Sequence, residues 1–327
     1  MYLGANLRIR KLGLCVIGGL LILVYLYSVR TSTNTISMKT LLAGAIKAAE
    51  IGGLEIIDVH NNRRLNIESK GKTNEGVNDP VTAADYKSHC AMYNALKAAF
   101  PKITVISEEK SKECDKVNVF DLTDSFKNID DWKFDDFFVN VNDVTIWIDP
   151  LDATKEFTEN LLQYVTTMVC ISIKKEPIIG VIHKPFESKS TYWAWVDHGS
   201  SDNFKIHLPE DNKVPVLIVS RSHAGTIQNA SRLAFGDNVQ IISAAGAGYK
   251  TLEVVAGNAT AYVHMTAIKK WDICACSAII RTLGGRMTPL TSSGRISFGA
   301  NDPTVLNSGV LATMKDHNWY LDKFNNV

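Results

Sequence analysis

The sequence predicts a protein in two halves, an α+β first half and an alternating α/β second half, behind one N-terminal membrane helix. Strand-like apolar runs joined by short turns between residues 145 and 196 predict an antiparallel meander. Strand-like and helix-like segments alternate from residue 214 to residue 283, which is typical of α/β folds. An uncharged apolar stretch near the N-terminus supplies the membrane helix.

The composition excludes some classes of protein. Of the 327 residues, 46% are apolar and 21% are charged, so the chain can bury a core and does not have the composition of a disordered protein. The formal net charge of +1 gives no indication of a nucleic-acid polymer as a partner. The length suits one large domain or two smaller ones.

Residues 12–29 predict a membrane anchor. The run LGLCVIGGLLILVYLYSV would nearly cross a bilayer core as a helix that rises about 1.5 Å per residue. Basic residues within 1–11 favour a cytoplasmic tail, and a polar stem over 30–37 follows the anchor. The alternative is a cleaved signal peptide, but the apolar run is long for one and no clear Ala-x-Ala site follows. An uncleaved anchor gives a single-pass type II protein whose remaining chain is lumenal.

The six cysteines do not form a recognisable disulfide framework in a chain of this length. Cys170, Cys274 and Cys276 lie in apolar runs and are interpreted as small core residues. Cys90 and Cys114 are able to pair, although nothing in the sequence requires it.

Two triplets, Asn229-Ala-Ser and Asn258-Ala-Thr, are acceptor sequences for N-glycosylation in a lumenal protein. Such triplets also arise by chance. Their occupancy is therefore left open.

Apolar spacing and helix breakers predict the elements of the first half. Residues 38–59 have apolar residues at helical spacing, and 82–100 form a second helix that Pro101 ends. A short strand over 103–106 leads into an acidic loop over 110–143. The strands of the meander are expected at 145–148, 165–173, 178–183 and 191–196.

The second half is expected to begin after a turn-rich boundary, and we divide the chain into 38–195 and 196–327. No internal repeat is apparent. The expected strands lie at 215–220, 239–242 and 260–264, and the expected helices lie at 224–234, 248–257 and 272–283.

The stretch WIDPLDATKEF, residues 147–157, places two aspartates three positions apart at the end of an apolar strand. In a structural interpretation Asp149 caps a helix, Pro150 is its first residue and Asp152 completes a capping box. In a chemical interpretation the acids bind a metal, because packed carboxylates repel one another unless a cation offsets them. Mg²⁺ prefers such oxygen ligands, and a helix start would add N–H groups for a phosphate. Zinc is disfavoured, because the sequence has no His-x-x-x-His or Cys-x-x-Cys pair.

Four motifs in order resemble those of the inositol monophosphatase superfamily, from about residue 38 to the C-terminus. The resemblance implies a layered αβαβα sandwich, with a largely antiparallel sheet in the first half and a mixed sheet in the second. It also implies a Mg²⁺-dependent, lithium-sensitive phosphomonoesterase. The motifs are Thr82-Ala-Ala-Asp85, Ser107-Glu108-Glu109, Asp149-Pro-Leu-Asp152-Ala-Thr154 and Trp271-Asp272.

The resemblance implies roles for these residues. Residues 38–195 would form the metal-binding half and 196–327 the substrate-binding half. Thr154, with Asp85 or Glu108, would orient a metal-activated water for in-line attack on phosphorus. The ligands of two or three Mg²⁺ ions would be Glu108, Asp149, the carbonyl of Leu151, Asp152 and Asp272, with Asp85 as an outer carboxylate.

One position departs from the family pattern. The family usually has glycine where this chain has Ala153, and glycine tolerates positive φ and close backbone approach. The turn must therefore accept a Cβ atom here. Asp152, Ala153 and Thr154 are still expected to contact the substrate.

The second half is expected to select the phosphate ester. Ser220-Arg-Ser-His223 follows a strand, and Gly246-Ala-Gly248-Tyr-Lys250 begins a helix where glycines and a lysine can bind a second anion. Each motif alone also fits a turn, a cap or a solvated lysine. Together they resemble the branch of the family that removes the 3′-phosphate from adenosine 3′,5′-bisphosphate (PAP). The resemblance implies substrate contacts by Ser220, His223, Gly246, Gly248, Lys250 and Asp272.

That branch implies an enzyme of the Golgi lumen that clears PAP, the by-product of sulfotransferases. PAP would be its small-molecule partner, and a homodimer is left open. Two other functions also stay open, namely a membrane-anchored inositol monophosphatase and a catalytically silent nucleotide-binding membrane protein. A comparison of the hydrolysis of PAP and of inositol 1-phosphate would distinguish a PAP phosphatase from an inositol monophosphatase. The intact set of acids argues against the catalytically silent protein.

Overall fold

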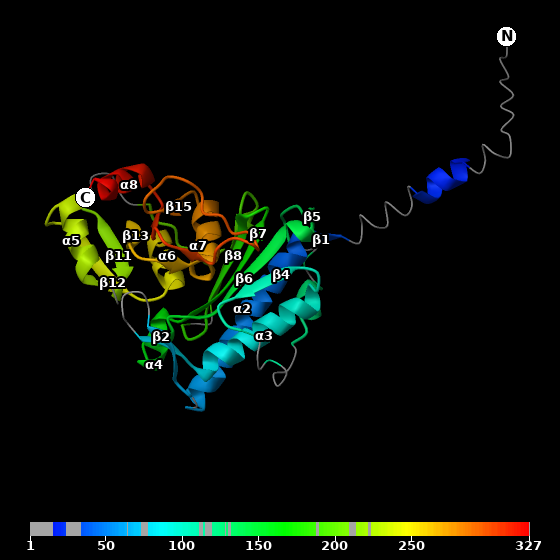
Figure 1. Cartoon of the computed structure of the whole chain (residues 1–327), viewed down its shortest axis with the longest axis horizontal. Coiled ribbons are helices and arrows are strands. Elements are labelled where there is room, and N and C mark those ends of the chain that lie inside the picture. The colour runs from blue at the N-terminus through cyan, green and yellow to red at the C-terminus, as the bar shows by residue number, and fades with distance from the viewer. Residues whose placement is uncertain are drawn as a thin grey trace, which may run out of the picture.

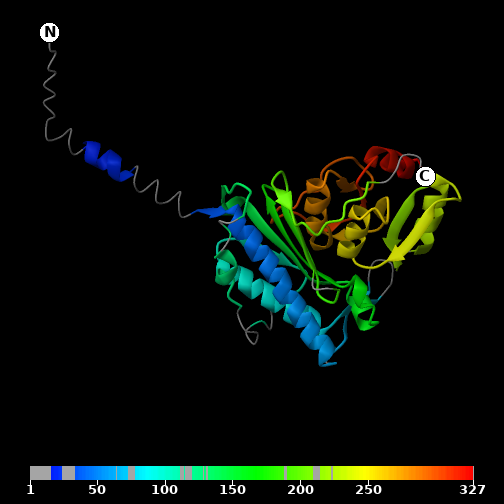
Figure 2. The same ribbon diagram turned by 180° about the vertical axis from the view of Figure 1, so that it is seen from behind.

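The fold is a sandwich of five layers in the order helices, sheet, helices, sheet, helices (Figure 1 and Figure 2). This confirms the predicted αβαβα architecture. The computed structural model describes residues 16–23, 34–63, 65–72, 78–110, 114, 120–127, 129, 132–187, 190–208, 214–221 and 224–326.

The first layer contains α2 (Met38–Asn61) and α3 (Ala83–Ala99), which agree with the predicted helices to within two residues. The Ser37 hydroxyl caps α2 by accepting from the Thr40 N–H at 3.1 Å. A capping box formed by Thr82 and Asp85 begins α3. Both helices bury an apolar face against the first sheet, so this layer forms one core with the sheet.

The first sheet has the strand order β10-β9-β8-β7-β6-β4. All its pairs are antiparallel except the parallel pair of β4 and β6, as the predicted meander requires. The strands are β4 (Thr104–Ser107), β6 (Val144–Asp152), β7 (Thr166–Ile173), β8 (Glu176–Lys184), β9 (Ser190–Trp195) and β10 (Gly199–Ser200).

The middle layer contains α6 (Ala247–Val255) and α7 (Lys270–Thr282). Helix α7 covers the face of the first sheet opposite α2 and belongs to the largest apolar core. Gly180 on β8 permits this close approach, because a Cβ atom there would lie 2.3 Å from the Ala275 carbonyl oxygen. The two halves of the chain therefore meet directly at α7.

The second sheet has the order β12-β11-β13-β17-β15, with parallel pairs around β11 and antiparallel pairs at β17. Its outer face is covered by α5 (Ala224–Phe235) and α8 (His317–Asn325). Strands β15 and β17 and helix α8 were not predicted, and the two strands are too short to show a clear alternation. The strands are β11 (Val216–Ser220), β12 (Gln240–Ala244), β13 (Ala261–His264), β15 (Arg286–Pro289) and β17 (Val310–Thr313).

Smaller elements complete the fold. The predicted acidic loop contains β5 and two short 3₁₀ helices within its described residues. These elements are β1 (Thr35–Ser37) with β5 (Phe138–Asn140), β2 (Glu68–Lys72) with β3 (Asn78–Val81), β14 (Ile268–Lys269) with β16 (Val305–Leu306), the helix α4 (Thr154–Thr158), and the 3₁₀ helices η2 (Thr123–Phe126), η4 (Val141–Asp143) and η5 (Leu162–Tyr164).

The predicted anchor at 12–29 lies mostly outside the described residues, which include only 16–23 of it as a helix. Among the helices that the structure describes, none is both long enough and apolar enough to span a membrane. The anchor and the tail at 1–11 stay predictions.

Two disulfides join distant parts of the fold, Cys90–Cys114 and Cys170–Cys274. The interpretation of Cys170 and Cys274 as unpaired core residues is therefore wrong, although both are buried. Their Cα atoms lie 5.6 Å apart across the contact of β7 with α7, which suits a disulfide. Sequence patterns show an apolar environment but not which strand and helix pack together. Cys276 is free and buried, as predicted.

Candidate active site

Carboxylates from four elements gather where the first sheet meets α3 and α7. Asp85 lies in the first turn of α3 and Glu108 directly follows β4. Asp149 and Asp152 lie on β6, and Asp272 lies in the first turn of α7. Burial raises the pKa of Asp149 well above its ordinary value, and the charges of the other four acids raise it further. The structure therefore brings together all five predicted acids.

The capping interpretation of Asp149 is wrong. Strand β6 continues to Asp152, and α4 begins only at Thr154. Asp149 pairs with Met168 of β7, and its Oδ1 accepts a hydrogen bond from the Leu151 N–H at 3.2 Å. Strand pairing extends past Pro150 through an irregularity between the two aspartates, so neither aspartate caps a helix.

Ala153 has the left-handed conformation, with φ 70° and ψ 44°. The expectation that this turn must accept a Cβ atom is confirmed. Such a conformation costs a non-glycine residue roughly 1–2 kcal/mol. The Ala153 carbonyl accepts from the Phe157 N–H at 2.9 Å, which anchors the turn to the start of α4.

Asp85 and Thr154 form one hydrogen-bonded unit. The Thr154 hydroxyl lies 2.8 Å from Asp85 Oδ1 and 3.1 Å from the Leu151 carbonyl oxygen. The Thr82 N–H and hydroxyl donate to Asp85 Oδ2 at 2.7 and 2.6 Å. Burial raises the pKa of Asp85 to about 6, although the Thr82 and Thr154 hydrogen bonds oppose this shift. Asp85 is consequently a carboxylate that can exchange a proton near neutral pH.

Glu108 is paired with a lysine that sequence analysis did not identify. Lys70 on β2 places its Nζ 2.9 Å from Glu108 Oε1 and also contacts Glu109 Oε1. Loss of hydration raises the pKa of Glu108 to about 7, and the Lys70 charge opposes that shift. No local pattern marks Lys70, because the contact depends on how β2 folds back over the acids.

The glycine motif holds Asp152 in place. The Gly248 N–H donates to Asp152 Oδ2 at 2.8 Å, and the Thr166 hydroxyl lies 3.3 Å from the same oxygen. Gly246 has φ +68°, and a Cβ atom there would lie 2.9 Å from both Asp152 Oδ2 and the Tyr164 carbonyl oxygen. The Gly248 N–H is therefore occupied by a carboxylate of the protein itself. Substrate contacts by Gly246 and Gly248 stay predictions.

Lys250 is buried, with 3% of its surface exposed, so the alternative of a solvated lysine is wrong. Its Nζ lies 5.0 Å from the centre of the Tyr262 ring. Burial lowers the pKa of Lys250, and the charges of Asp152, Glu156 and Asp272 oppose that change. Lys250 thus supplies positive charge to the acid cluster from the second half.

Ser220 is the last residue of β11. The Ser220 hydroxyl is 3.3 Å from His264 Nδ1, whereas His223 lies outside the described residues. Arg221 forms ion pairs with Glu156 at 3.3 Å and Glu159 at 3.4 Å, which tie the end of β11 to α4. Sequence analysis singled out neither His264 nor these ion pairs.

Asp272 connects the second half to the acids. Burial raises the pKa of Asp272 well above its ordinary value, as do the charges of Glu108 and Asp152, while a hydrogen bond from the Lys269 backbone opposes the shift. Cys274 lies two residues after Asp272, and its disulfide with Cys170 links α7 to β7. The disulfide thus holds acids of the two halves together against their repulsion.

The donor set fits a hard divalent cation. Every candidate ligand is an oxygen, and the raised pKa values of Asp149 and Asp272 indicate that Lys70 and Lys250 offset the clustered charges only in part. In the described part of the chain, the compact group of three potential metal ligands is instead His89, Cys90 and Cys114. Two of those sulfurs form a disulfide, so they are not thiolate ligands. The carboxylates are thus the better site for Mg²⁺.

The profile of the inositol monophosphatase family matches residues 37–326. The chain belongs to this family. Members of the family act on small phosphate esters and are typically Mg²⁺-dependent, and this chain is a phosphatase of that family.

Two curated relatives of this family member carry different names. A putative inositol monophosphatase 3 of Drosophila melanogaster is 44% identical over 98% of this chain and 94% of the relative. A Golgi-resident adenosine 3′,5′-bisphosphate 3′-phosphatase of Mus musculus is 43% identical over 88% of this chain and 81% of the relative. An inositol monophosphatase structure from Anabaena superimposes with a TM-score of 0.62 at 17% identity, covering 89% of this chain and 96% of that one, and supports the fold alone.

Proposed function

We propose that this phosphatase is a Mg²⁺-dependent, lithium-sensitive enzyme that hydrolyses the 3′-phosphate of PAP to give AMP and phosphate. The observation that carries the proposal is the 43% identity, over 88% of the chain, to the mouse protein named for that reaction. The buried Lys250 supports it, because a substrate with two phosphates needs more positive charge in the second half than an inositol with one phosphate.

The residues of the acid cluster suit in-line attack by water. Because the Thr154 hydroxyl donates its hydrogen to Asp85, the Thr154 oxygen is free to accept a hydrogen bond from the attacking water. Asp85, with a pKa of about 6, is ionised at neutral pH and able to take the water proton. The water oxygen bonds to phosphorus while the bond from phosphorus to the ribose 3′-oxygen breaks. The departing 3′-oxygen takes a proton from solvent water to become a hydroxyl, and Asp85 afterwards returns its proton to the solvent.

Two or three Mg²⁺ ions would be held by the side chains of the acid cluster and by one carbonyl. When bound, Mg²⁺ offsets the charge of the phosphate and lowers the pKa of water. The proposed ligands are Glu108, Asp149, the Leu151 carbonyl, Asp152 and Asp272, with Asp85 as an outer carboxylate. The proposed substrate contacts are Asp152, Ala153, Thr154, Ser220, His223, Gly246, Gly248, Lys250 and Asp272.

The proposed location in the cell is inferred from the same mouse relative, which is named as Golgi-resident. The enzyme would be a type II protein of the Golgi membrane, anchored by residues 12–29, with its metal-binding half at 38–195 and its substrate-binding half at 196–327 in the lumen. There it would remove PAP and so support sulfation. Asn229 and Asn258 are both exposed, which suits glycosylation in that compartment.

The decisive experiment measures kcat/KM of the purified protein for PAP and for inositol 1-phosphate, each with Mg²⁺, without Mg²⁺ and with added Li⁺. We expect a preference for PAP of at least about tenfold, since two phosphates engage more charge than one. Hydrolysis of PAP should stop without Mg²⁺ and fall with Li⁺.

The second candidate is an inositol monophosphatase, which the name of the Drosophila relative favours. Equal or faster hydrolysis of inositol 1-phosphate would establish it and reject the nucleotide proposal. Hydrolysis of neither ester would instead favour the silent nucleotide-binding protein.

A further inference from the structure

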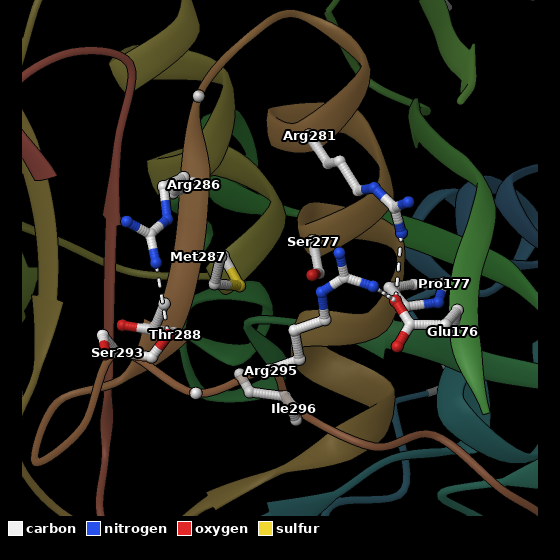
Figure 3. Close-up of a pocket in the computed structure, with 12 residues that line it drawn as sticks. Glu176, Pro177, Ser277, Arg281, Arg286, Met287, Thr288, Ser293, Arg295 and Ile296 are labelled. Atoms are coloured by element: carbon white, nitrogen blue, oxygen red, sulfur yellow. Dashed lines mark hydrogen bonds and ion pairs between the residues drawn. The ribbon is translucent and has the colours of Figure 1, made fainter. Parts of the chain in front are cut away.

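A second charged cavity lies at the other end of α7 (Figure 3). It has a volume of about 290 Å³, and none of the predicted active-site residues lines it. Three arginines surround it from three separate parts of the chain. Arg281 lies on α7, Arg286 on β15, and Arg295 on the segment that follows β15. Glu176 and Pro177 of β8 complete the lining, so the cavity forms where the two halves of the chain meet, and no sequence motif marks it.

The arginines are only partly neutralised. Glu176 is the one acid among the described residues that line the cavity. A single oxygen of Glu176 accepts from Arg281 and from Arg295, each at 3.1 Å. Three arginines against one glutamate leave a formal charge of +2 around the cavity.

Arg286 is bound by neutral groups. Its two terminal nitrogens donate to Asn318 Oδ1 at 2.8 Å and to the Ser293 carbonyl oxygen at 3.2 Å. Figure 3 shows Arg286 on one side of the cavity, while Arg281 and Arg295 point toward Glu176 on the other side. Two separate sources of positive charge therefore flank one space.

The charge of Arg286 acts on a neighbouring buried histidine. His317 Nε2 lies 2.9 Å from the hydroxyl of Thr288, which lines the cavity. Burial lowers the pKa of His317 to about 4, and the Arg286 charge lowers it further. His317 is thus neutral at physiological pH, and the excess positive charge comes from the arginines.

The floor of the cavity is built from packed residues. Ser277 and Met287 are each 8% exposed, and Thr288 is 3% exposed. Guanidinium groups present several N–H donors in a planar fork that matches two oxygens of an oxyanion. A packed floor with guanidinium donors on both sides suits a tetrahedral anion that bridges them.

We propose that this cavity binds a tetrahedral oxyanion, either free phosphate or sulfate or the same group as a monoester. Such an anion would take N–H donors from Arg286 on one side and from Arg281 and Arg295 on the other. Glu176 competes with the anion for those two arginines. The site is independent of the carboxylate cluster and does not rest on the proposed reaction.

The test uses metal-free full-length protein, because the carboxylate cluster repels anions when no cation is present. Isothermal titration calorimetry at constant ionic strength measures binding of inorganic phosphate, inorganic sulfate and methyl sulfate. We expect saturable binding that Arg286→Gln weakens by about tenfold, the effect of losing one charge-assisted pair. The methyl sulfate titration distinguishes an ester site from a site for free anions only.

Glu176→Gln gives the opposite expectation. Removing the competing carboxylate frees Arg281 and Arg295, so anion affinity should rise several-fold. Arg232→Gln, on the exposed side of α5, is the matched control and should change nothing. Unchanged Mg²⁺-dependent phosphatase activity shows that each variant is folded. An affinity that neither Arg286→Gln nor Glu176→Gln alters would overturn the proposal, as would the absence of saturable binding by the native protein.

Discussion

The two ends of α7 carry charges of opposite sign in different surroundings. At its start, Asp272 joins four other acids that are largely shielded from water. At its end, Arg281 joins two other arginines, and its side chain is 37% exposed. Each sign lies at the end of the helix where the helix dipole stabilises it.

The difference between the two regions is one of solvation. The arginines can be hydrated, so they remain charged without a full set of partners. The acids are poorly hydrated, so burial and mutual repulsion raise their pKa values unless a cation is bound. We therefore propose that the two ends of this helix differ in function, with a metal ion stabilising the acids at one end and an anion bound by the arginines at the other.

Removing one charge from the acid end should abolish activity. For Asp152→Asn we expect phosphate release to fall about a thousandfold, which corresponds to the several kcal/mol that a bound metal contributes. The rates of phosphate release by this variant and by the native protein should be compared at saturating Mg²⁺. Asp322→Asn, an exposed substitution on α8, is the control. Activity of Asp152→Asn near that of the control would refute the metal assignment.

Opening the disulfide at the acid end should destabilise the protein. The Cys170–Cys274 bond closes a separation of 104 residues, so Cys170→Ala with Cys274→Ala should lower the free energy of unfolding by about 2–5 kcal/mol. The half-saturating Mg²⁺ concentration should also rise, because α7 then holds Asp272 less firmly. Urea unfolding and Mg²⁺ titration measure the two effects. The bond Cys90–Cys114, with a separation of 24 residues, is the comparison and should contribute less stability.

The pH should change how strongly Mg²⁺ stabilises the protein. The pKa of Asp85 rises from 3.8 to about 6 and that of Glu108 from 4.5 to about 7. A raised pKa favours the folded state below the unfolded pKa, and this stability is lost as pH rises through the folded pKa. The metal-free protein therefore loses this stability between about pH 4 and 7. The increase in Tm caused by Mg²⁺ should grow across that range. An increase that is constant with pH would contradict the account.

Ala153→Gly should have the smallest effect. Glycine relieves the left-handed strain of Ala153 but adds entropy to the unfolded chain, so the free energy of unfolding should change by less than about 1 kcal/mol. Chemical denaturation measures it, and the variant should keep its Mg²⁺-dependent activity. A loss of activity would mean that the Ala153 methyl group contributes to the site.

The sequence predicts the acid end of α7 far better than the arginine end. Asp149, Asp152 and Asp272 belong to short motifs, and the helices and strands that carry them show clear apolar periodicity. Lys70, Arg221 and the Cys170–Cys274 bond were missed because each depends on a contact between elements distant in the chain. The capping interpretation of Asp149 failed because pairing with β7 outweighed the local signal of a proline-initiated helix.

The central claim is that the acid cluster holds protons in place of a cation. Calorimetric titration of Mg²⁺ into metal-free protein near pH 7, repeated in two buffers of different ionisation enthalpy, counts the protons released on binding. Because the pKa values of Glu108, Asp149 and Asp272 are raised, we predict saturable binding with net proton release that Asp272→Asn reduces. Binding without proton release, or identical titrations for the native protein and Asp272→Asn, would contradict the account.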